Sequence, residues 1–404
     1  MRTYRELFRT PEFTPLFLNT TTQIAASTVS GLAMGTLVHS ATGSPLLSAL
    51  AMFGPSLAQV LGATTLLAAA DRLPPRAALT AMALVFGLAT AAMAVPGLPV
   101  WALFAILFGL GTIAAVGGGV RGGLLNEILT TDGYLLGRSV LNMSVGTMQI
   151  CGYAVAGALV TVLSPRGTLL TGAALYLAAA AVARFGLTRR PPRTTERPSI
   201  GRTWRNNALL WSSGPRRYVY LALWVPNGLI VGCEALFVPY APAHAGLLFA
   251  SASIGMLFGD TVLGRFVPAR WRERLGAPLR LLLAVPFLVF ALHPPLPLAM
   301  AAVAIACVGY AASLLLQERL MALTPHELSG HALGLHTSGM LTMQGVAAVL
   351  AGTLAQFTSP ATAMTVMAVA SVAVTLALAP GLAPRQPRDA DDTAAPRHRV
   401  TRRT

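Results

Sequence analysis

Residues 188–216 read TRRPPRTTERPSIGRTWRNNALLWSSGPR and form the longest polar stretch of a chain of 404 residues. The rest is strongly apolar: 54% of the residues are hydrophobic, only 11% are charged, and the mean hydropathy is +0.64. Soluble domains carry about 25% charged residues, so this composition excludes both a soluble enzyme with one membrane anchor and a disordered chain. The apolar runs are continuous rather than alternating, which also argues against an outer-membrane barrel.

Six apolar runs precede the polar stretch and six follow it, each long enough for the roughly 20 residues that a transmembrane helix needs. The expected spans are residues 14–38, 44–70, 77–95, 98–120, 138–163, 167–187, 217–241, 244–264, 277–293, 296–317, 330–357 and 360–380. The sequence therefore predicts an all-α integral membrane protein with twelve transmembrane helices.

The distribution of basic residues supports this number. All 29 are Arg, and if the N-terminus faces inside, 28 of them fall on that side and only Arg166 on the other. The positive-inside rule then predicts a multi-pass protein of the cell membrane with both termini cytoplasmic. Because the Arg residues flank apolar runs, we expect the net charge of +15 to face anionic membrane lipids and not nucleic acid.

The three cysteines lack metal-ligand spacing, and neither a metal nor another cofactor is expected.

The two halves of the sequence are related. A shift of 193 residues places Gly62, Arg72 and Pro75 on Gly255, Arg265 and Pro268. The same shift matches the glycines of the fifth and eleventh spans, at positions 137, 146 and 152 with 330, 339 and 345. We therefore expect two pseudo-symmetric six-helix bundles, residues 1–187 and 217–384, joined by a cytoplasmic Arg- and Pro-rich linker at 188–216. Residues 385–404 are expected to form a disordered cytoplasmic tail. Such repeats are typical of secondary transporters.

Two short motifs carry a family resemblance. Residues 67–76 read Leu-x-x-x-Asp-Arg-x-Pro-Pro-Arg, and residues 152–157 read Gly-Tyr-Ala-Val-Ala-Gly. The first resembles the Gly-x-x-x-Asp-Arg-x-Gly-Arg-Arg loop of the major facilitator superfamily, and the second its span-five exporter motif, Gly-Pro-x-x-Gly-Gly. Over nearly its whole length the chain is similar to the twelve-span bacterial drug and siderophore exporters of that family. The family's span-four arginine falls near Ala105, where this sequence has no basic residue.

The resemblance implies a cytoplasmic gate between the bundles. Its expected members are Asp71, Arg72 and Arg76 in the first half and Asp260, Arg265 and Arg138 by pseudo-symmetry. Asp71 is expected to accept hydrogen bonds from the N-terminal amides of the eleventh span, and Asp260 to pair with Arg138. The alternatives are a topogenic loop for Asp71 and a coupling carboxylate for Asp260. Gly152 and Gly157 are expected to form a helix-packing motif.

Polar side chains inside the spans are candidates for a substrate or proton cavity, because a mid-membrane charge costs about 2.5–3.5 kcal/mol. The expected cavity residues are Glu234, Asn19, Gln23, Asn227 and Tyr310. Glu234 could exchange a proton as the cavity changes face, attract a cationic substrate, or only bond a neighbouring helix. Interhelical packing is the alternative for the amides, and plain packing for Tyr310. Glu127 with Arg121, and Glu318 with Arg319, are interpreted as surface charge pairs.

No catalytic motif is present, so the protein is not expected to be an enzyme. The leading hypothesis is a secondary active transporter, a monomer that exports a small amphipathic compound in exchange for protons by alternating access. An importer or facilitator on the same fold, or a non-transporting membrane scaffold or sensor, are the alternatives.

Overall fold

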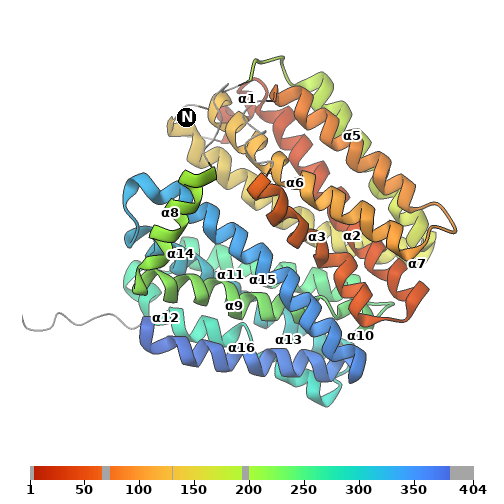
Figure 1. Ribbon diagram of the computed structural model, residues 1–404, viewed down its shortest axis with the longest axis vertical. Helices are drawn as coiled ribbons and strands as arrows, with labels where there is room; N and C mark the ends of the chain where they lie inside the picture. Colours follow the sequence, from red (N-terminus) through yellow and green to blue (C-terminus); the bar gives the residue numbers. More distant parts are fainter. Residues whose placement is uncertain (1–3, 66–72, 130, 193–199, 383–404) are drawn as a thin grey trace, which may run out of the picture.

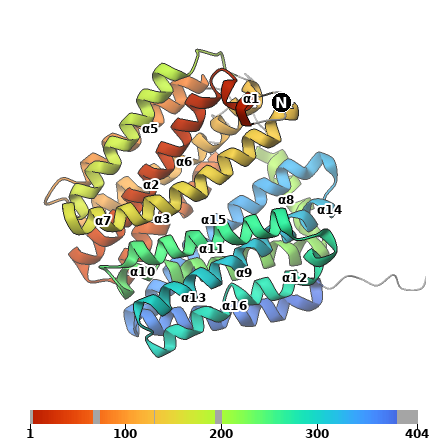
Figure 2. The same cartoon turned by 180° about the vertical axis from the view of Figure 1, so that it is seen from behind.

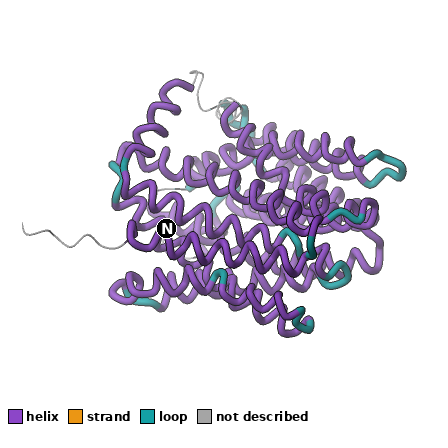
Figure 3. The backbone as a smooth tube through the Cα atoms, turned by 60° about the horizontal axis from the view of Figure 1, so that its bottom comes forward, coloured by secondary structure: helices purple, strands orange, loops and turns teal. Residues whose placement is uncertain are grey.

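Proline marks the start of many helices in the computed structural model, which describes residues 4–65, 73–129, 131–192 and 200–382. Pro45, Pro75 and Pro360 are first residues of helices, and others follow a proline directly. Proline suits this position because its fixed φ matches a helix and its missing N–H has no partner there. In the described part of the chain the secondary structure is entirely helical, with loops at the helix ends (Figure 3).

The elements run in chain order as follows: α1 Tyr4–Arg9, α2 Phe13–Thr42, α3 Pro45–Thr65, α5 Pro75–Met93, α6 Val100–Ile128, α7 Thr131–Gly186, α8 Ile200–Ser212, α9 Gly214–Glu234, α10 Phe237–Tyr240, α11 Ala245–Phe266, α12 Ala269–Leu282, η1 Val285–Leu292, α13 Leu296–Val308, η2 Gly309–Ala311, α14 Ala312–Ala322, η3 His326–Leu328, α15 Ser329–Phe357 and α16 Pro360–Leu382.

Eleven helical segments of the described chain are long and apolar enough to cross a membrane, and one of them is long enough to cross it twice. The segment Leu136–Gly186 has 51 residues, about 76 Å at 1.5 Å per residue, which is more than two bilayer cores of about 30 Å. Its helix breaks at Ser164, whose φ of 66° and ψ of 166° are not helical, just before Pro165. The structure therefore has twelve crossings, as the sequence predicts. The main difference lies in α6, which continues to Ile128 rather than ending at residue 120.

The helices form two bundles, α1 to α7 in red to yellow-green and α9 to α16 in green to blue (Figures 1 and 2). The same close packing recurs in both. A Cβ on Gly62 would overlap the backbone carbonyl of Thr112, and one on Gly255 would overlap that of Ala304. The second helix of each half thus touches the fourth helix backbone to backbone, at glycines that the 193-residue repeat relates.

The halves meet through two helix pairs, α3 beside α15 and α7 beside α11 (Figures 1 and 2). Their backbone-to-backbone contacts lie toward the end that carries the α2–α3 and α15–α16 connections, which we call the closed face. There a Cβ on Gly246 would lie 2.7 Å from the Cα of Gly157, and one on Gly352 would lie 2.7 Å from the Cα of Leu46. At the opposite end, which carries the start of α2 and the end of α16, a Cβ on Gly330 would meet nothing within 4 Å.

Arg190 holds the start of the linker against the first bundle. Its guanidinium lies 3.2 Å from the carboxylates of both Glu12 and Glu127, and the Thr188 hydroxyl donates to Glu12 as well. Glu127 therefore pairs with Arg190, and the expected surface pair with Arg121 is not formed. The reason is that α6 extends past its expected end and keeps Arg121 inside the bundle.

Candidate functional site: a cavity between the halves

A cavity of about 430 Å³ lies between the two bundles. The first half contributes Phe53 from α3 and two residues of α7, and the second half contributes residues of α9, α11, α15 and the tenth span. Its polar lining residues are Gln149, Tyr153, Glu234, Ser253, Asp260, Tyr310, Ser313, Gln317 and Gln344. The carboxyl groups of Glu234 and Asp260 are charged or chargeable, and no described lining residue is basic.

Glu234 sits where the seventh span is interrupted. It is the last residue of α9, and the helical conformation of this span resumes only at Phe237, in α10. Among the candidate spans of the described chain, this one has the largest buried share. The Tyr310 hydroxyl donates to its Oε1 at 3.2 Å, and the Cys307 thiol approaches the same oxygen at 3.6 Å. Tyr310 itself lies in η2, where the tenth span changes from α13 to α14. Interrupted helices that meet at a buried polar site are typical of transporter substrate sites.

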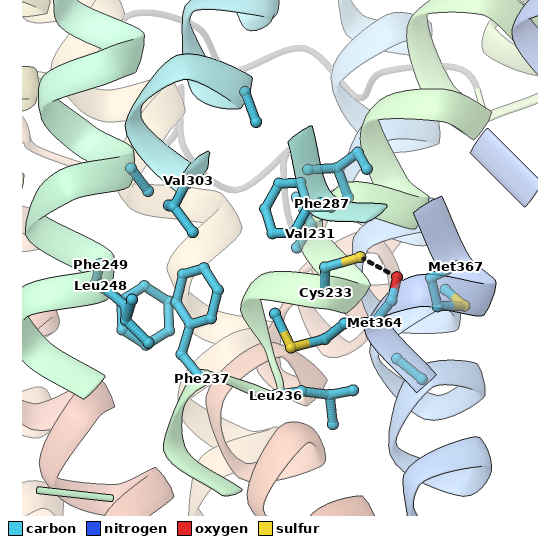
Figure 4. Packing of buried hydrophobic residues seen from close by; sticks show 14 of the residues in the cluster. Val231, Cys233, Leu236, Phe237, Leu248, Phe249, Phe287, Val303, Met364 and Met367 are labelled. Atoms are coloured by element: carbon cyan, nitrogen blue, oxygen red, sulfur yellow. Dashed lines mark hydrogen bonds between the residues drawn. The ribbon is translucent and has the colours of Figure 1, made fainter. Parts of the chain in front are cut away.

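Aromatic side chains close the cavity toward the closed face. Tyr153 of α7 stacks on Phe249 of α11 at a ring distance of 4.6 Å, across the junction between the halves. Phe237 packs edge-on against Phe249 at 4.9 Å. Figure 4 shows Phe237 and Phe249 among other buried residues of the second half, with the Cys233 thiol donating to the Met364 carbonyl.

Asp260 faces the same cavity as Glu234. It lies six residues before the end of α11, near the end of the molecule that carries the start of α2 and the end of α16. The described residues contain no ion pair between Asp260 and Arg138, whose side chain is exposed. The expected gating pair is therefore not formed in this conformation, because α7 and α11 approach most closely near the closed face instead.

The three amides predicted for the cavity lie outside its wall. The Asn19 side chain is fully buried and donates to the Ala179 carbonyl at 2.8 Å, which joins α2 to α7. Asn227 donates to the hydroxyl of Ser313 at 2.8 Å, so it contacts a residue of the cavity lining without being part of that lining. Gln23 lines a separate chamber inside the first half.

The residues predicted for the gate are placed only in part. Asp71 and Arg72 lie outside the described residues. Arg76 is half-buried in the first turn of α5, and Arg265 is exposed in the last turn of α11.

The two glycines of the packing motif are both in close contacts. A Cβ on Gly152 would lie 3.0 Å from the Thr28 side chain of α2, and one on Gly157 would lie 3.1 Å from the Cα of Gly246. Gly152 thus packs within the first half, while Gly157 packs between the halves.

Sequence reasoning missed several lining residues, including Tyr153, Ser313, Gln317 and Gln344. For Gln149 the sequence offered a signal, because it lies seven residues after Asn142, on the same face of the fifth span. Asp260 was assigned to the gate because the repeat pairs its neighbourhood with the loop at 67–76.

The fold and this site define a multi-pass membrane transporter, with a polar cavity between two six-helix bundles. The Major Facilitator Superfamily model matches residues 16–316, and the chain belongs to that family. A comparison with curated protein sequences gives no match.

Solved structures share the fold at low identity. A POT family transporter in complex with a thioalcohol-conjugated peptide superposes with a TM-score of 0.73 at 10% identity, covering 92% of this chain and 96% of that one. A bacterial homologue of the human lysosomal transporter Spinster, inward-facing and unoccupied, gives 0.69 at 14%, covering 95% and 97%. The nucleoside transporter NupG gives 0.70 at 13%, covering 92% and 100%. These likenesses show the fold alone.

Proposed function

We propose that the protein exports a small amphipathic compound across the cell membrane in exchange for protons. The observation that supports this most is the pair of carboxyl groups, Glu234 and Asp260, in a cavity with no basic lining residue among those described. Together with the aromatic wall of Tyr153 and Phe249, this lining suits a compound with an apolar body and a positive charge.

Glu234 is the residue proposed to couple the two movements. In a closed cavity the carboxyl group is favoured in its neutral form, because burial disfavours charge. When the cavity opens to water, the group can release its proton, and its carboxylate then attracts the cationic substrate. Proton and substrate thus compete for one site, which is the requirement for exchange. Because one proton is exchanged for one monovalent cation, no net charge crosses the membrane. The pH difference therefore supplies the energy, about 1.4 kcal/mol per pH unit, which supports a substrate gradient of about tenfold.

The proposed orientation assigns one end of the molecule to each side of the membrane. With 28 of the 29 Arg residues on the side of the termini, we infer that this side is cytoplasmic. The halves are in contact at the closed face, so the conformation described is shut toward the outside. Export then requires the closed-face contacts to separate while the cytoplasmic side closes.

Transport into inside-out vesicles tests this proposal. The probe is the fluorescent cation ethidium. Inside-out vesicles that contain the wild type should accumulate the dye when their lumen, which corresponds to the outside of the cell, is more acidic than the surrounding buffer. Glu234→Gln should abolish the gradient-driven component. Glu318→Gln is the matched control, because Glu318 is an exposed carboxylate of α14 outside the cavity lining, and it should transport normally.

Two results would overturn parts of this account. Unchanged gradient-driven transport by Glu234→Gln would remove Glu234 from the mechanism. Accumulation of the probe in intact cells, with none in inside-out vesicles, would show an importer on the same fold.

A further inference from the structure

The first half contains a second chamber, of about 210 Å³, that shares no lining residue with the central cavity. It lies between α2, α3, α5, α6 and α7. Its polar lining residues are Gln23, Ser27, Gln59, Arg121 and Tyr176. Gln23 is about 15 Å along α2 from Phe13, at 1.5 Å per residue, so the chamber lies well inside the membrane-spanning region.

Arg121 has no acidic partner in the described part of the chain. The ion pairs there join Arg190 to Glu12 and Glu127, and Arg121 takes part in neither. Its hydrogen bond runs from Nη1 to the Oε1 of Gln23 at 2.5 Å. An arginine side chain stays protonated in proteins. This chamber therefore holds a fixed positive charge, and the hydrogen-bond partner given above for that charge, Gln23, is neutral. A charge inside the membrane is costly unless it is paired.

The other polar groups of the chamber add further donors. Gln23 uses its carbonyl oxygen to accept from Arg121, which leaves its NH₂ group to donate elsewhere. Gln59 supplies a second amide, and Tyr176 supplies a hydroxyl. Met82 and Phe86 complete the wall with apolar surface. A guanidinium, two amides and a phenol around one small cavity form a donor set suited to an anion.

We propose that this chamber binds a small monovalent anion, a halide or a compact carboxylate, against Arg121. The anion supplies the counter-charge that the described protein lacks there, and it joins α2, α6 and α7 through their side chains. The site is separate from the proposed proton and substrate cavity, and it does not depend on the direction of transport.

Thermal unfolding of the purified protein in detergent tests the proposal. At constant pH and ionic strength, replacing gluconate with chloride should raise the melting temperature saturably, by about 5 °C at a hundredfold excess over the dissociation constant. Formate in place of chloride distinguishes a carboxylate site from a halide site. Arg121→Gln should lose the response, whereas Arg265→Gln, a change at an exposed arginine of α11, should keep it.

A measurement on the unmodified protein covers the case in which Arg121→Gln does not fold. The ³⁵Cl resonance should broaden in the presence of wild-type protein and sharpen again when formate or iodide displaces chloride. Glu234→Gln should broaden it equally, so a failure of the proposed export mechanism would leave this result intact. The absence of anion-specific stabilisation and of displaceable broadening in the wild type would overturn the proposal, as would a full response in folded Arg121→Gln.

Discussion

The two halves of this transporter share one architecture but differ in the chemistry at their centres. In the second half, Glu234 lies where the seventh span breaks, next to Tyr310, where the tenth span changes helix type. In the first half, the corresponding spans α2 and α6 run without interruption, and Arg121 points a fixed charge at Gln23. The interrupted spans carry Glu234, which can gain or lose a proton, and the continuous spans carry Arg121, which cannot.

This difference shows what a duplicated fold leaves free to vary. Close glycine contacts between the second and fourth helices are kept in both halves, because any side chain there would overlap backbone. The polar residues at the bundle centres are under no such packing constraint. The proposal therefore assigns proton exchange to the second half and a static role to the first.

Gly246→Leu should have the largest effect on transport. A Cβ at this position would lie 2.7 Å from both the Cα of Gly157 and the carbonyl oxygen of Tyr153, so the closed face could not form. We expect gradient-driven dye transport to fall by more than about tenfold, by analogy with overpacking costs of about 1–3 kcal/mol. Gly109→Leu is the control, since a Cβ there meets nothing within 4 Å. Normal transport by Gly246→Leu would show that closure at this face is not needed.

Gly62→Ala and Gly255→Ala should destabilise the protein to a similar degree. Each added methyl group would overlap a backbone carbonyl of the fourth helix in its own half. We expect a loss of about 1–3 kcal/mol for each, seen as a lower melting temperature in detergent. Gly118→Ala, which meets no neighbour, should be neutral. Should only one of the two glycines be sensitive, the equivalence of the halves in packing would fail.

Tyr310→Phe should weaken proton coupling without disturbing the fold. The change removes the hydroxyl that donates to Glu234 at 3.2 Å, and a hydrogen bond to a neutral group contributes about 0.5–1.5 kcal/mol. We expect transport at a fixed proton gradient to fall about fivefold to tenfold. Tyr240→Phe provides the comparison, because its hydroxyl donates to the Pro294 carbonyl outside the cavity lining. Equal losses in the two variants would separate Tyr310 from the coupling mechanism.

Asn19→Ala and Asn227→Ala should have the smallest effects. They should lower stability alike but differ in their effect on transport. Each loses one interhelical hydrogen bond of 2.8 Å, for which membrane proteins show an average of about 0.6 kcal/mol. Stability should therefore fall slightly in both. Only Asn227→Ala should also reduce transport, because its partner Ser313 lines the cavity. A transport defect confined to Asn19→Ala would reverse the proposed division of roles.

The sequence predicted the large-scale structure because hydropathy and Arg position report on the membrane itself. Twelve crossings and two related bundles can be predicted without knowing which side chains are in contact. The site was harder, because an amide inside a span looks the same whether it faces a cavity or a neighbouring helix. Glu234 and Tyr310 lie together at the cavity, whereas Asn19 contacts a backbone carbonyl. Arg121 was misplaced because the fourth span was expected to end at residue 120, whereas α6 continues to Ile128.

Cysteine accessibility at Ser253 tests alternating access most directly. Ser253 lines the central cavity from α11, and Cys151, Cys233 and Cys307 would first be replaced so that only the introduced thiol can react. In the resting protein, a membrane-impermeant maleimide should label Ser253→Cys from the side of the termini. An imposed proton gradient should shift labelling toward the opposite side. Labelling from one side alone under every gradient would contradict the account.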